Sequence, residues 1–209
     1  MLFDYLKNHY KEGEPIFLDD INIEGMTRPN LRQQIKTLTD NGKLIRYDKG
    51  IYYIPKQTHF NNASGPSSEM VASYKYISRE GKTNGYYSGN TFANLIGLSL
   101  QVPTKKEIVS NNSAAIVKEV TIGKQKYIIR SSNVPITEDN VKVLQFLELL
   151  KNLDSYIDLD YDEARKIIIA YLRHNHITKS AISKYIHYYP DSTFRHYYEM
   201  RLDDVLTQK

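Results

Sequence analysis

The chain has 209 residues, of which 41% are hydrophobic and 25% charged, and its formal net charge is +4. This length accommodates two domains, or one domain with an appendage, and no apolar run approaches the roughly 20 residues of a membrane-spanning helix. The chain has no cysteine, which excludes disulfides, zinc fingers and thiol chemistry. At the N-terminus, Asp4 stands where a signal peptide would carry positive charge before an apolar stretch. We therefore expect a soluble, cytoplasmic protein.

The first 25 residues predict two helices. Leu2, Phe3, Leu6 and Tyr10 give an apolar stripe, which predicts a helix ending at Gly13. A short second helix, around Phe17 to Ile23, is expected to cross over the helix that follows it. Residues 1–25 carry two lysines and six acids, so this segment is acidic.

Residues 28–41 are predicted to form a helix with recognisable ends. Thr27 can cap its N-terminus, Pro29 lies in the first turn, where its missing N–H costs nothing, and Gly42 suits the left-handed residue after the last turn. Leu31, Ile35 and Leu38 form the apolar stripe. The other faces carry side chains that can bond base edges or phosphates: Asn30, Arg32, Gln33, Lys36 and Thr37.

After Gly42 the apolar period becomes alternating, which predicts a two-stranded ribbon. Residues 44–47 and 51–54 are the expected strands, residues 48–50 form the turn, and Pro55 ends the ribbon. A capped helix followed directly by such a ribbon is the layout of a winged helix-turn-helix. Residues 26–56 contain seven Lys or Arg and two acids, so positive charge is concentrated on the segment that would meet DNA.

We therefore predict that residues 1–56 form a winged helix-turn-helix that binds double-stranded operator DNA. The helix would enter the major groove, and the wing, with Arg46, Lys49 and Tyr47, would lie beside the phosphates. The alternative is a small packed unit with surface lysines, which the charge segregation disfavours. The candidate DNA-binding residues are Thr27, Arg28, Asn30, Arg32, Gln33, Lys36, Arg46 and Lys49.

Residues 57–68 are polar, contain Gly and Pro and lack periodicity, so we predict a linker before a second domain at 69–209. A helix capped by Ser67 or Ser68 should follow, with Val71, Tyr74 and Ile77 as its stripe, and should end near Gly81. Residues 85–90 look like a turn-rich segment. The short helix after them should have Phe92, Leu95 and Ile96 on its apolar side and should end at Gly97.

From residue 103 the pattern becomes β, with strands expected at 107–110, 115–122 and 127–129 in a small, antiparallel sheet. The region from Thr137 onward is predicted to be helical. Further helices are expected near Tyr161 to His174, near Lys179 to Tyr188 and after Pro190. The predicted fold class is α+β, with an N-terminal winged helix-turn-helix followed by an α+β domain with C-terminal helices.

Charge also alternates along these last helices. Residues 137–163 carry eight acids and two lysines, whereas residues 164–201 carry seven Lys or Arg and two acids. Lys179, Lys184 and Arg195 could form a second nucleic-acid contact. The alternative, which we favour, is that these charges compensate the acidic segment within the same domain.

Two segments resemble the AbiEi family of antitoxins, from type IV toxin–antitoxin systems that defend bacteria against phage. They are residues 42–55, with a basic residue followed by Gly-aliphatic-Tyr, and residues 87–98 with Gln101-Val-Pro103 after them. The likeness covers roughly residues 1–130, and the helices after Thr137 match the family less well. It implies a winged helix that binds operator DNA and represses the operon, and a C-terminal domain that counters a nucleotidyltransferase-like toxin.

The remaining motifs do not predict catalysis. Asp158 and Asp160 lack the preceding Gly-Ser of a nucleotidyltransferase and are expected in a solvated loop, while His174 and His176 have no acid at ligand spacing. Phosphate-binding glycine loops and a nucleophile elbow are absent from the sequence. We therefore expect a non-enzymatic transcriptional repressor and antitoxin without cofactor or metal. The alternative is a regulator without a toxin partner, or an interaction module that uses the tyrosine-rich C-terminal helices.

Overall fold

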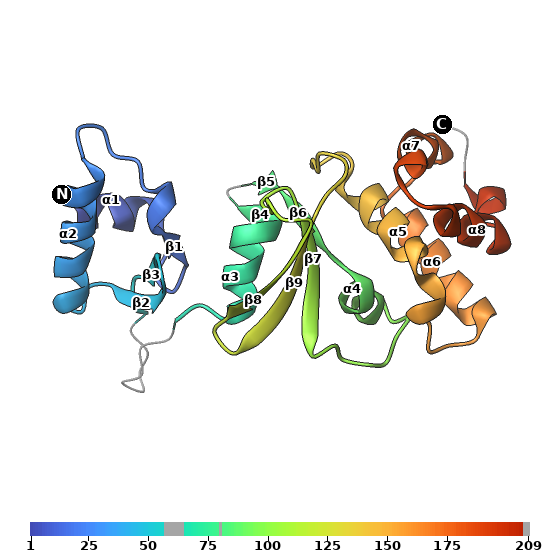
Figure 1. Cartoon of the computed structure of the whole chain (residues 1–209), viewed down its shortest axis with the longest axis horizontal. Helices are drawn as coiled ribbons and strands as arrows, with labels where there is room; N and C mark the ends of the chain where they lie inside the picture. The colour runs from blue at the N-terminus through green and yellow to red at the C-terminus, as the bar shows by residue number, and fades with distance from the viewer. Residues whose placement is uncertain (57–64, 80, 207–209) are drawn as a thin grey trace. The chain divides into compact units, whose positions relative to one another are not determined.

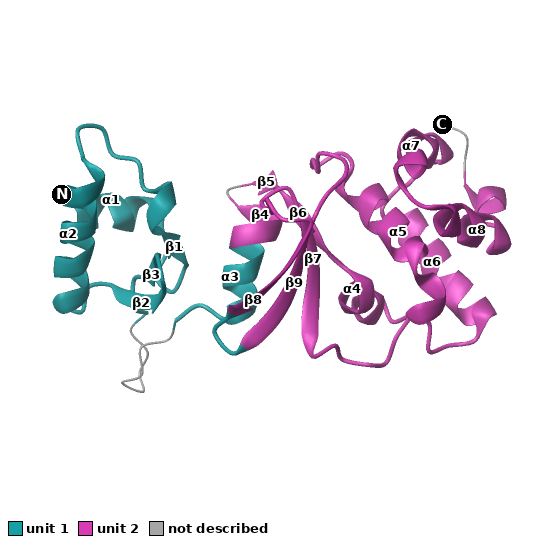
Figure 2. Ribbon diagram, in the orientation of Figure 1, with its two compact units in different colours: residues 1–74, 122–124 teal, residues 75–121, 125–209 magenta. Residues whose placement is uncertain are grey.

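The computed structural model describes residues 1–56, 65–79 and 81–206 (Figure 1). The chain divides into two compact units, shown in Figure 2. Unit 1 comprises residues 1–74 and 122–124, and unit 2 comprises residues 75–121 and 125–209. The predicted linker lies largely outside the described residues, which resume at Gly65. The mixture of helices and small sheets confirms the predicted α+β class.

Unit 1 begins with α1 (Leu2–His9), β1 (Ile16–Phe17) and a 3-10 turn, η1 (Leu18–Asp20). The helix α2 (Arg28–Asp40) and the strands β2 (Ile45–Asp48) and β3 (Ile51–Tyr53) follow. The strands form an antiparallel sheet in the order β1-β3-β2. The helix and ribbon predicted from residues 28–54 are therefore present, in an arrangement compatible with a winged helix.

The prediction of a second helix from Phe17 to Ile23 is wrong. Ile16 and Phe17 instead pair with Tyr52 and Ile51 of β3, and only the 3-10 turn of η1 follows. The reason is tertiary, because this pairing adds a third strand to the ribbon and takes Phe17, the first residue of the predicted helix. The helix α1 also ends at His9, four residues before the predicted Gly13.

One apolar cluster holds unit 1 together. Leu2 and Leu6 of α1 pack with Leu31 and Ile35 of α2 and with Ile16 of β1. Leu38, the third residue of the predicted stripe, is partly buried against the same cluster. Burial of these side chains fixes which face of α2 is turned away from solvent.

The segment from Ser67 to Thr83 begins with α3 (Ser68–Ala72), whose first turn is capped by Ser67: its Oγ accepts from the backbone N–H of Met70 at 3.1 Å. The helix continues as a π-helical turn, η2 (Ser73–Ile77), before the short hairpin of β4 (Ser78–Arg79) and β5 (Lys82–Thr83). The predicted cap is confirmed. The helical stretch ends at Ile77, earlier than the predicted Gly81.

Unit 2 contains a four-stranded sheet of β6 (Gly85–Ser88), β7 (Lys105–Ser110), β8 (Val117–Ile122) and β9 (Gln125–Ser131). The strand order is β6-β7-β9-β8. The pair β6–β7 is antiparallel, but β7 and β9 are parallel, so the sheet is mixed rather than wholly antiparallel as predicted. The chain passes from β7 to the far edge, forms β8, and returns between the two as β9.

Residues 85–88 form β6 instead of the predicted turn. A Cβ at Gly85 would lie 2.2 Å from the carbonyl oxygen of Tyr76 and 2.5 Å from that of Val109. Glycine is therefore required here by the close approach of neighbouring backbone. The same residue reads as a turn signal in the sequence.

The helices of unit 2 are α4 (Gly89–Leu95), α5 (Val141–Lys151), α6 (Tyr161–His174), α7 (Lys179–Tyr185) and α8 (Asp191–Glu199). Three 3-10 turns accompany them: η3 (Leu153–Ser155), η4 (Ile186–Tyr188) and η5 (Asp203–Val205). Both predicted ends of α6 are confirmed. Leu95 was wrongly assigned to the apolar side of α4, since it is 61% exposed.

The helix α5 begins at Val141, four residues after the predicted start at Thr137. Asn140 explains the delay, because its side chain organises a turn: Oδ1 accepts from the N–H of Thr137 at 2.8 Å, and Nδ2 donates to the carbonyl of Pro135 at 2.9 Å. Asn, Asp and Ser commonly compete with helical hydrogen bonds in this way.

The apolar face of α5 is the centre of unit 2 and packs with α4, α6, α7 and α8. One buried polar residue of this helix, Gln145, links three elements. Its Nε2 donates to the carbonyl of Tyr87 in β6 at 2.8 Å, and its Oε1 accepts from the hydroxyl of Tyr171 in α6 at 3.0 Å. Of the described helices, none is long and apolar enough to cross a membrane.

Candidate nucleic-acid interface

The first turn of α2 is fixed by the residues that the sequence singled out. The Oγ1 of Thr27 accepts from the backbone N–H of Asn30 at 3.4 Å, and Pro29 lies within the first turn. The predicted cap is confirmed. Asn30 is held from the other side, because its Oδ1 accepts from Nε2 of Gln34 at 3.1 Å.

Arg28 is anchored to the segment before α2. Its guanidinium donates to the carbonyls of Leu18 at 3.0 Å, Asp19 at 3.1 Å and Ile21 at 3.4 Å. These carbonyls belong to η1 and the residue after it. The side chain therefore ties the 3-10 turn to the N-terminus of α2, at the position where the sequence predicted a second helix.

The exposed face of α2 carries basic and amide side chains. Arg32, Gln33, Lys36 and Thr37 are exposed, whereas Leu31 and Ile35 are buried. The hydroxyl of Thr37 donates to the carbonyl of Gln33 at 3.1 Å. The side chains of Arg32, Gln33 and Lys36 have no hydrogen bond to any residue that the structure describes.

The turn between β2 and β3 is short and also basic. Arg46 and Lys49 are exposed; Nε of Arg46 donates to the carbonyl of Asp48 at 3.3 Å, and the N–H of Lys49 donates to Oδ1 of Asp48 at 2.6 Å. Gly50 has φ 73°, a left-handed conformation that closes this turn. Burial, with a smaller effect of the neighbouring Asp48 carboxylate, raises the pKa of Tyr47.

The cations of residues 26–56 are exposed and form no ion pairs with described residues. There are seven of them: Arg28, Arg32, Lys36, Lys43, Arg46, Lys49 and Lys56. In unit 2 some cations are paired, since Lys105 pairs with Glu119 and Lys179 with Asp203 at 2.8 Å, whereas others such as Lys142 and Lys166 form no ion pair with a described residue. Such cations are available to neutralise phosphates, except Arg28, whose guanidinium is engaged by backbone carbonyls.

The basic residues of the C-terminal helices are largely engaged within unit 2. Besides the Lys179–Asp203 pair, Arg195 contacts Asp154 of the acidic segment at 3.2 Å. Lys184 lies over the ring of Tyr185, with its Nζ 5.2 Å from the centroid. The Arg195–Asp154 contact agrees with the favoured interpretation, in which the charges compensate the acidic segment 137–163, whereas the partner of Lys179, Asp203, lies outside that segment.

The sequence did not predict the buried histidine of α8, which contacts the end of α5. His196 is only 2% exposed; its Nδ1 lies 2.6 Å from the carbonyl oxygen of Leu150, and its Nε2 lies 3.0 Å from Oδ2 of Asp154. The hydrogen bond from His196 is the main reason that the pKa of Asp154 is lowered. These contacts fasten α8 to the C-terminal end of α5.

The two carboxylates considered as a metal motif have structural contacts. Asp158 accepts from the hydroxyl of Ser99 at 2.6 Å and from the N–H of Leu100 at 3.1 Å, and these bonds lower its pKa. Asp160 caps α6, accepting from the N–H groups of Asp162 and Glu163 at 3.0 Å. Among the described residues, no group of three or more His, Asp or Glu could hold a metal.

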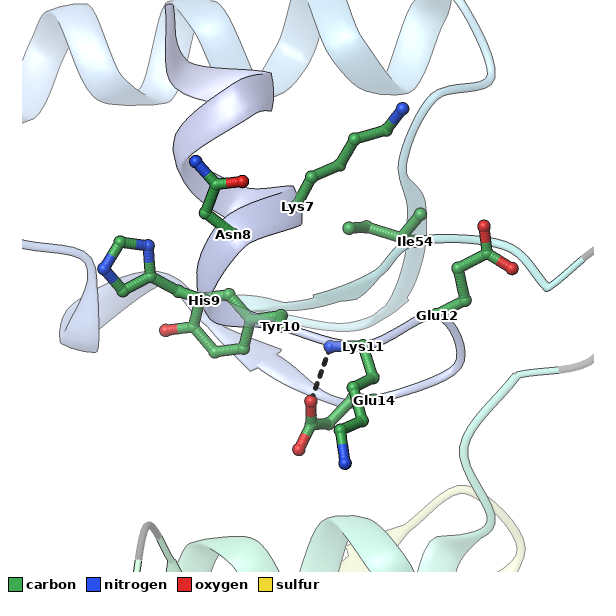
Figure 3. A pocket seen from close by; sticks show the side chains of 8 residues that line it. All are labelled: Lys7, Asn8, His9, Tyr10, Lys11, Glu12, Glu14 and Ile54. Atoms are coloured by element: carbon green, nitrogen blue, oxygen red, sulfur yellow. Dashed lines mark hydrogen bonds between the residues drawn. The ribbon is translucent and has the colours of Figure 1, made fainter.

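Unit 1 also has a hollow of about 590 Å³ around the end of α1 (Figure 3). Lys7, Lys11, Glu12 and Glu14 supply two charges of each sign, and Oε2 of Glu14 accepts from the backbone N–H of Lys11 at 2.7 Å. In Figure 3 the charged ends of Lys7, Glu12 and Glu14 do not converge on one point. The basic face of α2 and the wing therefore remains the candidate site of unit 1.

Comparison with known proteins places the chain in a family. No curated protein matches the sequence. A sequence model described as "Family of unknown function (DUF6088)" matches residues 2–180. The match covers the described parts of unit 1 and most of unit 2, so it is not confined to the candidate interface. The chain therefore belongs to the DUF6088 family.

Proposed function

We propose that the protein is a cytoplasmic transcriptional repressor that binds double-stranded operator DNA through unit 1. The observation that carries the proposal is the set of exposed, unpaired cations on α2 and the wing. Phosphate neutralisation by such cations supplies most of the affinity of non-specific binding and much of the affinity of specific binding.

The roles of the predicted residues differ. Arg32 and Lys36 would neutralise phosphates beside the groove, and Arg46 and Lys49 would do so from the wing. Gln33 would bond a base edge, because amides pair well with adenine in the major groove and, unlike Asn30, its side chain has no hydrogen bond to a described residue. Thr27 and Arg28 would act indirectly, since their polar groups already bond the backbone around the start of α2.

A salt series tests this proposal. Arg32→Ala and Lys36→Ala should each weaken binding to the DNA upstream of the protein's own coding sequence and reduce the log–log salt slope by roughly 0.9. Lys105→Ala, which removes a paired cation of unit 2, is the matched control and should leave the slope unchanged. Unchanged slopes for both α2 variants, measured by fluorescence anisotropy, would remove α2 from the interface.

We further propose that the protein is the antitoxin of a type IV pair with a nucleotidyltransferase-like toxin, and that it acts without enzymatic activity. The resemblance of residues 42–55 and 87–103 to the AbiEi family supports this part. The test is co-expression with a nucleotidyltransferase-like protein encoded beside it. The double variant Arg32→Ala/Lys36→Ala should lose repression yet still rescue growth, because both changes lie in unit 1.

A regulator or interaction module without a toxin partner is the second candidate. Exposed tyrosines on the C-terminal helices favour it, since Tyr188 and Tyr198 are at least half exposed and Tyr is enriched at interfaces. This candidate predicts no rescue by the wild-type protein in the same co-expression experiment. DNA binding by α2 would be retained in the regulator and absent from the interaction module.

A further inference from the structure

Unit 2 contains a cavity of about 260 Å³ between the sheet and α5. Its lining comes from the ends of β7 and β9, the start of β8, the loop at 132–134, α5 and Tyr189. The DNA-binding proposal does not use this cavity. Its volume lies just below the range of about 300–1,000 Å³ that is common for small-molecule pockets, so it fits a small metabolite.

The polar wall of the cavity is built from charged side chains whose bonding capacity is only partly used. Arg130 donates one N–H to Glu107 at 2.9 Å, and Lys151 donates to Oε1 of Glu148 at 2.7 Å. Glu148 is 14% exposed in its side chain, and its Oε2 has no hydrogen-bond partner within the described part of the chain. The site thus offers spare donors on two cations and a spare acceptor on one carboxylate.

The apolar wall of the cavity is formed by four aliphatic side chains: Val109, Ile116, Val117 and Val134. Ile116 is 83% exposed, so part of this apolar surface meets solvent. Tyr86 and Tyr189 also line the cavity, together with Ser131, Ser132 and Asn133, and burial raises the pKa of both tyrosine hydroxyls, which keeps them neutral.

The net charge of the site indicates the net charge of its ligand. The two ion pairs make the site electrically neutral, so a ligand with a net charge would leave one charge uncompensated in a partly desolvated place. A zwitterion would leave no charge uncompensated. Its carboxylate can accept from the spare N–H groups of Arg130 and Lys151, while its ammonium donates to Oε2 of Glu148. An apolar substituent on the same molecule would cover the valines and Ile116.

We infer that this cavity binds a free α-amino acid with an apolar side chain. The topology supports the location, because Val109 lies near the carboxyl end of β7 and Arg130 and Ser131 near that of β9, and these two strands are parallel. The lining residues of both strands therefore lie at the same end of the sheet. The inference is independent of the proposed DNA binding.

Calorimetric titration of the full-length protein tests the inference with four probes. L-Leucine and L-phenylalanine should bind saturably. 4-Methylpentanoate, which is leucine without its ammonium group, and 3-methylbutylamine, which lacks the carboxylate, should each bind at least about tenfold more weakly, since each loses hydrogen bonds between charged groups. Absence of saturable binding by both amino acids, or equal binding by leucine and either analogue, would overturn the inference.

Two variants connect that preference to the cavity. Glu148→Gln is isosteric and should weaken leucine binding about tenfold or more while narrowing the preference for leucine over 4-methylpentanoate. Lys151→Gln should weaken the binding of leucine but not the binding of 3-methylbutylamine, which has no carboxylate. Lys142→Gln, on the same helix but outside the lining, is the control. Unchanged leucine affinity in both cavity variants would show that leucine binds elsewhere. If a variant fails to fold, the titrations of the wild-type protein with the four probes still test the inference.

Discussion

Replacement of Arg28 by alanine tests whether a single side chain substitutes for the missing second helix of unit 1. Hydrogen bonds from a charged donor contribute about 1.5–3 kcal/mol when buried. Here the bonds to Leu18 and Asp19 are solvent exposed, and the bond to Ile21 is long at 3.4 Å. We therefore expect Arg28→Ala to destabilise unit 1 by about 1–2 kcal/mol in total, discounted for solvent competition.

Urea unfolding monitored through the amide NMR signals of α2 measures this effect. With a slope of about 2 kcal/mol per molar urea, the middle of the usual range for a small unit, the midpoint should fall by roughly 0.5–1 M. Arg28→Lys keeps the charge but not the planar fork, so it should recover less than half of the loss.

Arg32→Ala is the matched control, because Arg32 is exposed on the same helix and has no hydrogen bond or ion pair with a described residue. The free energy of unfolding of Arg32→Ala should differ from that of the wild type by no more than about 0.5 kcal/mol. The salt dependence of DNA binding should separate the two variants in the opposite way. Arg32→Ala should reduce the salt slope, whereas Arg28→Ala should lower the affinity for DNA and leave the slope unchanged. Equal urea midpoints for the two alanine variants would refute the role assigned to the Arg28 guanidinium.

Two further predictions concern unit 2. Gly85→Ala should destabilise it by more than about 2 kcal/mol, because the new Cβ would meet the backbone carbonyls of Tyr76 and Val109; a wild-type thermal midpoint would show that β6 can shift away at little cost. Asp154, whose pKa is lowered chiefly by the hydrogen bond from His196, should stabilise the fold above its unfolded pKa of 3.8 and lose that contribution as the pH falls through the lower, folded value. Because Asp154 is mostly exposed, the effect should stay below about 1 kcal/mol, and Asp154→Asn should abolish that part of the acid dependence in urea titrations between pH 5 and roughly pH 2.5. If the free energy of unfolding of Asp154→Asn falls at low pH as much as that of the wild type, this contribution does not come from Asp154.

Local signals were sufficient where an element is stabilised by its own residues. The cap at Thr27, the stripe of Leu31 and Ile35 and the glycine after the last turn together predict α2, and the same reasoning gives both ends of α6. Exposure of Arg32, Gln33 and Lys36 follows from the period alone, so the candidate interface could be predicted without coordinates.

Features that depend on distant partners could not be predicted in this way. Ile16 and Phe17 form a strand because β3 is beside them, and nothing in residues 17–23 indicates that pairing. The parallel pairing of β7 and β9 requires a crossover through β8, whereas consecutive strands with a turn at Gly123 predict only a hairpin. The role of Arg28 was missed for the same reason, since its acceptors are backbone carbonyls seven to ten residues upstream.

Gln145 has a consequence for how this protein can associate. Edge strands offer unpaired backbone groups to other chains and are common sites of intermolecular β-pairing. At the β6 edge, the carbonyl of Tyr87 is already taken by the Gln145 amide, which is itself held by Tyr171. An incoming strand would have to displace a buried side chain from α5 before it could pair there. Pairing at the β6 edge would therefore require partial opening of the helical layer, and the sheet is protected on that side for as long as α5 and α6 remain folded.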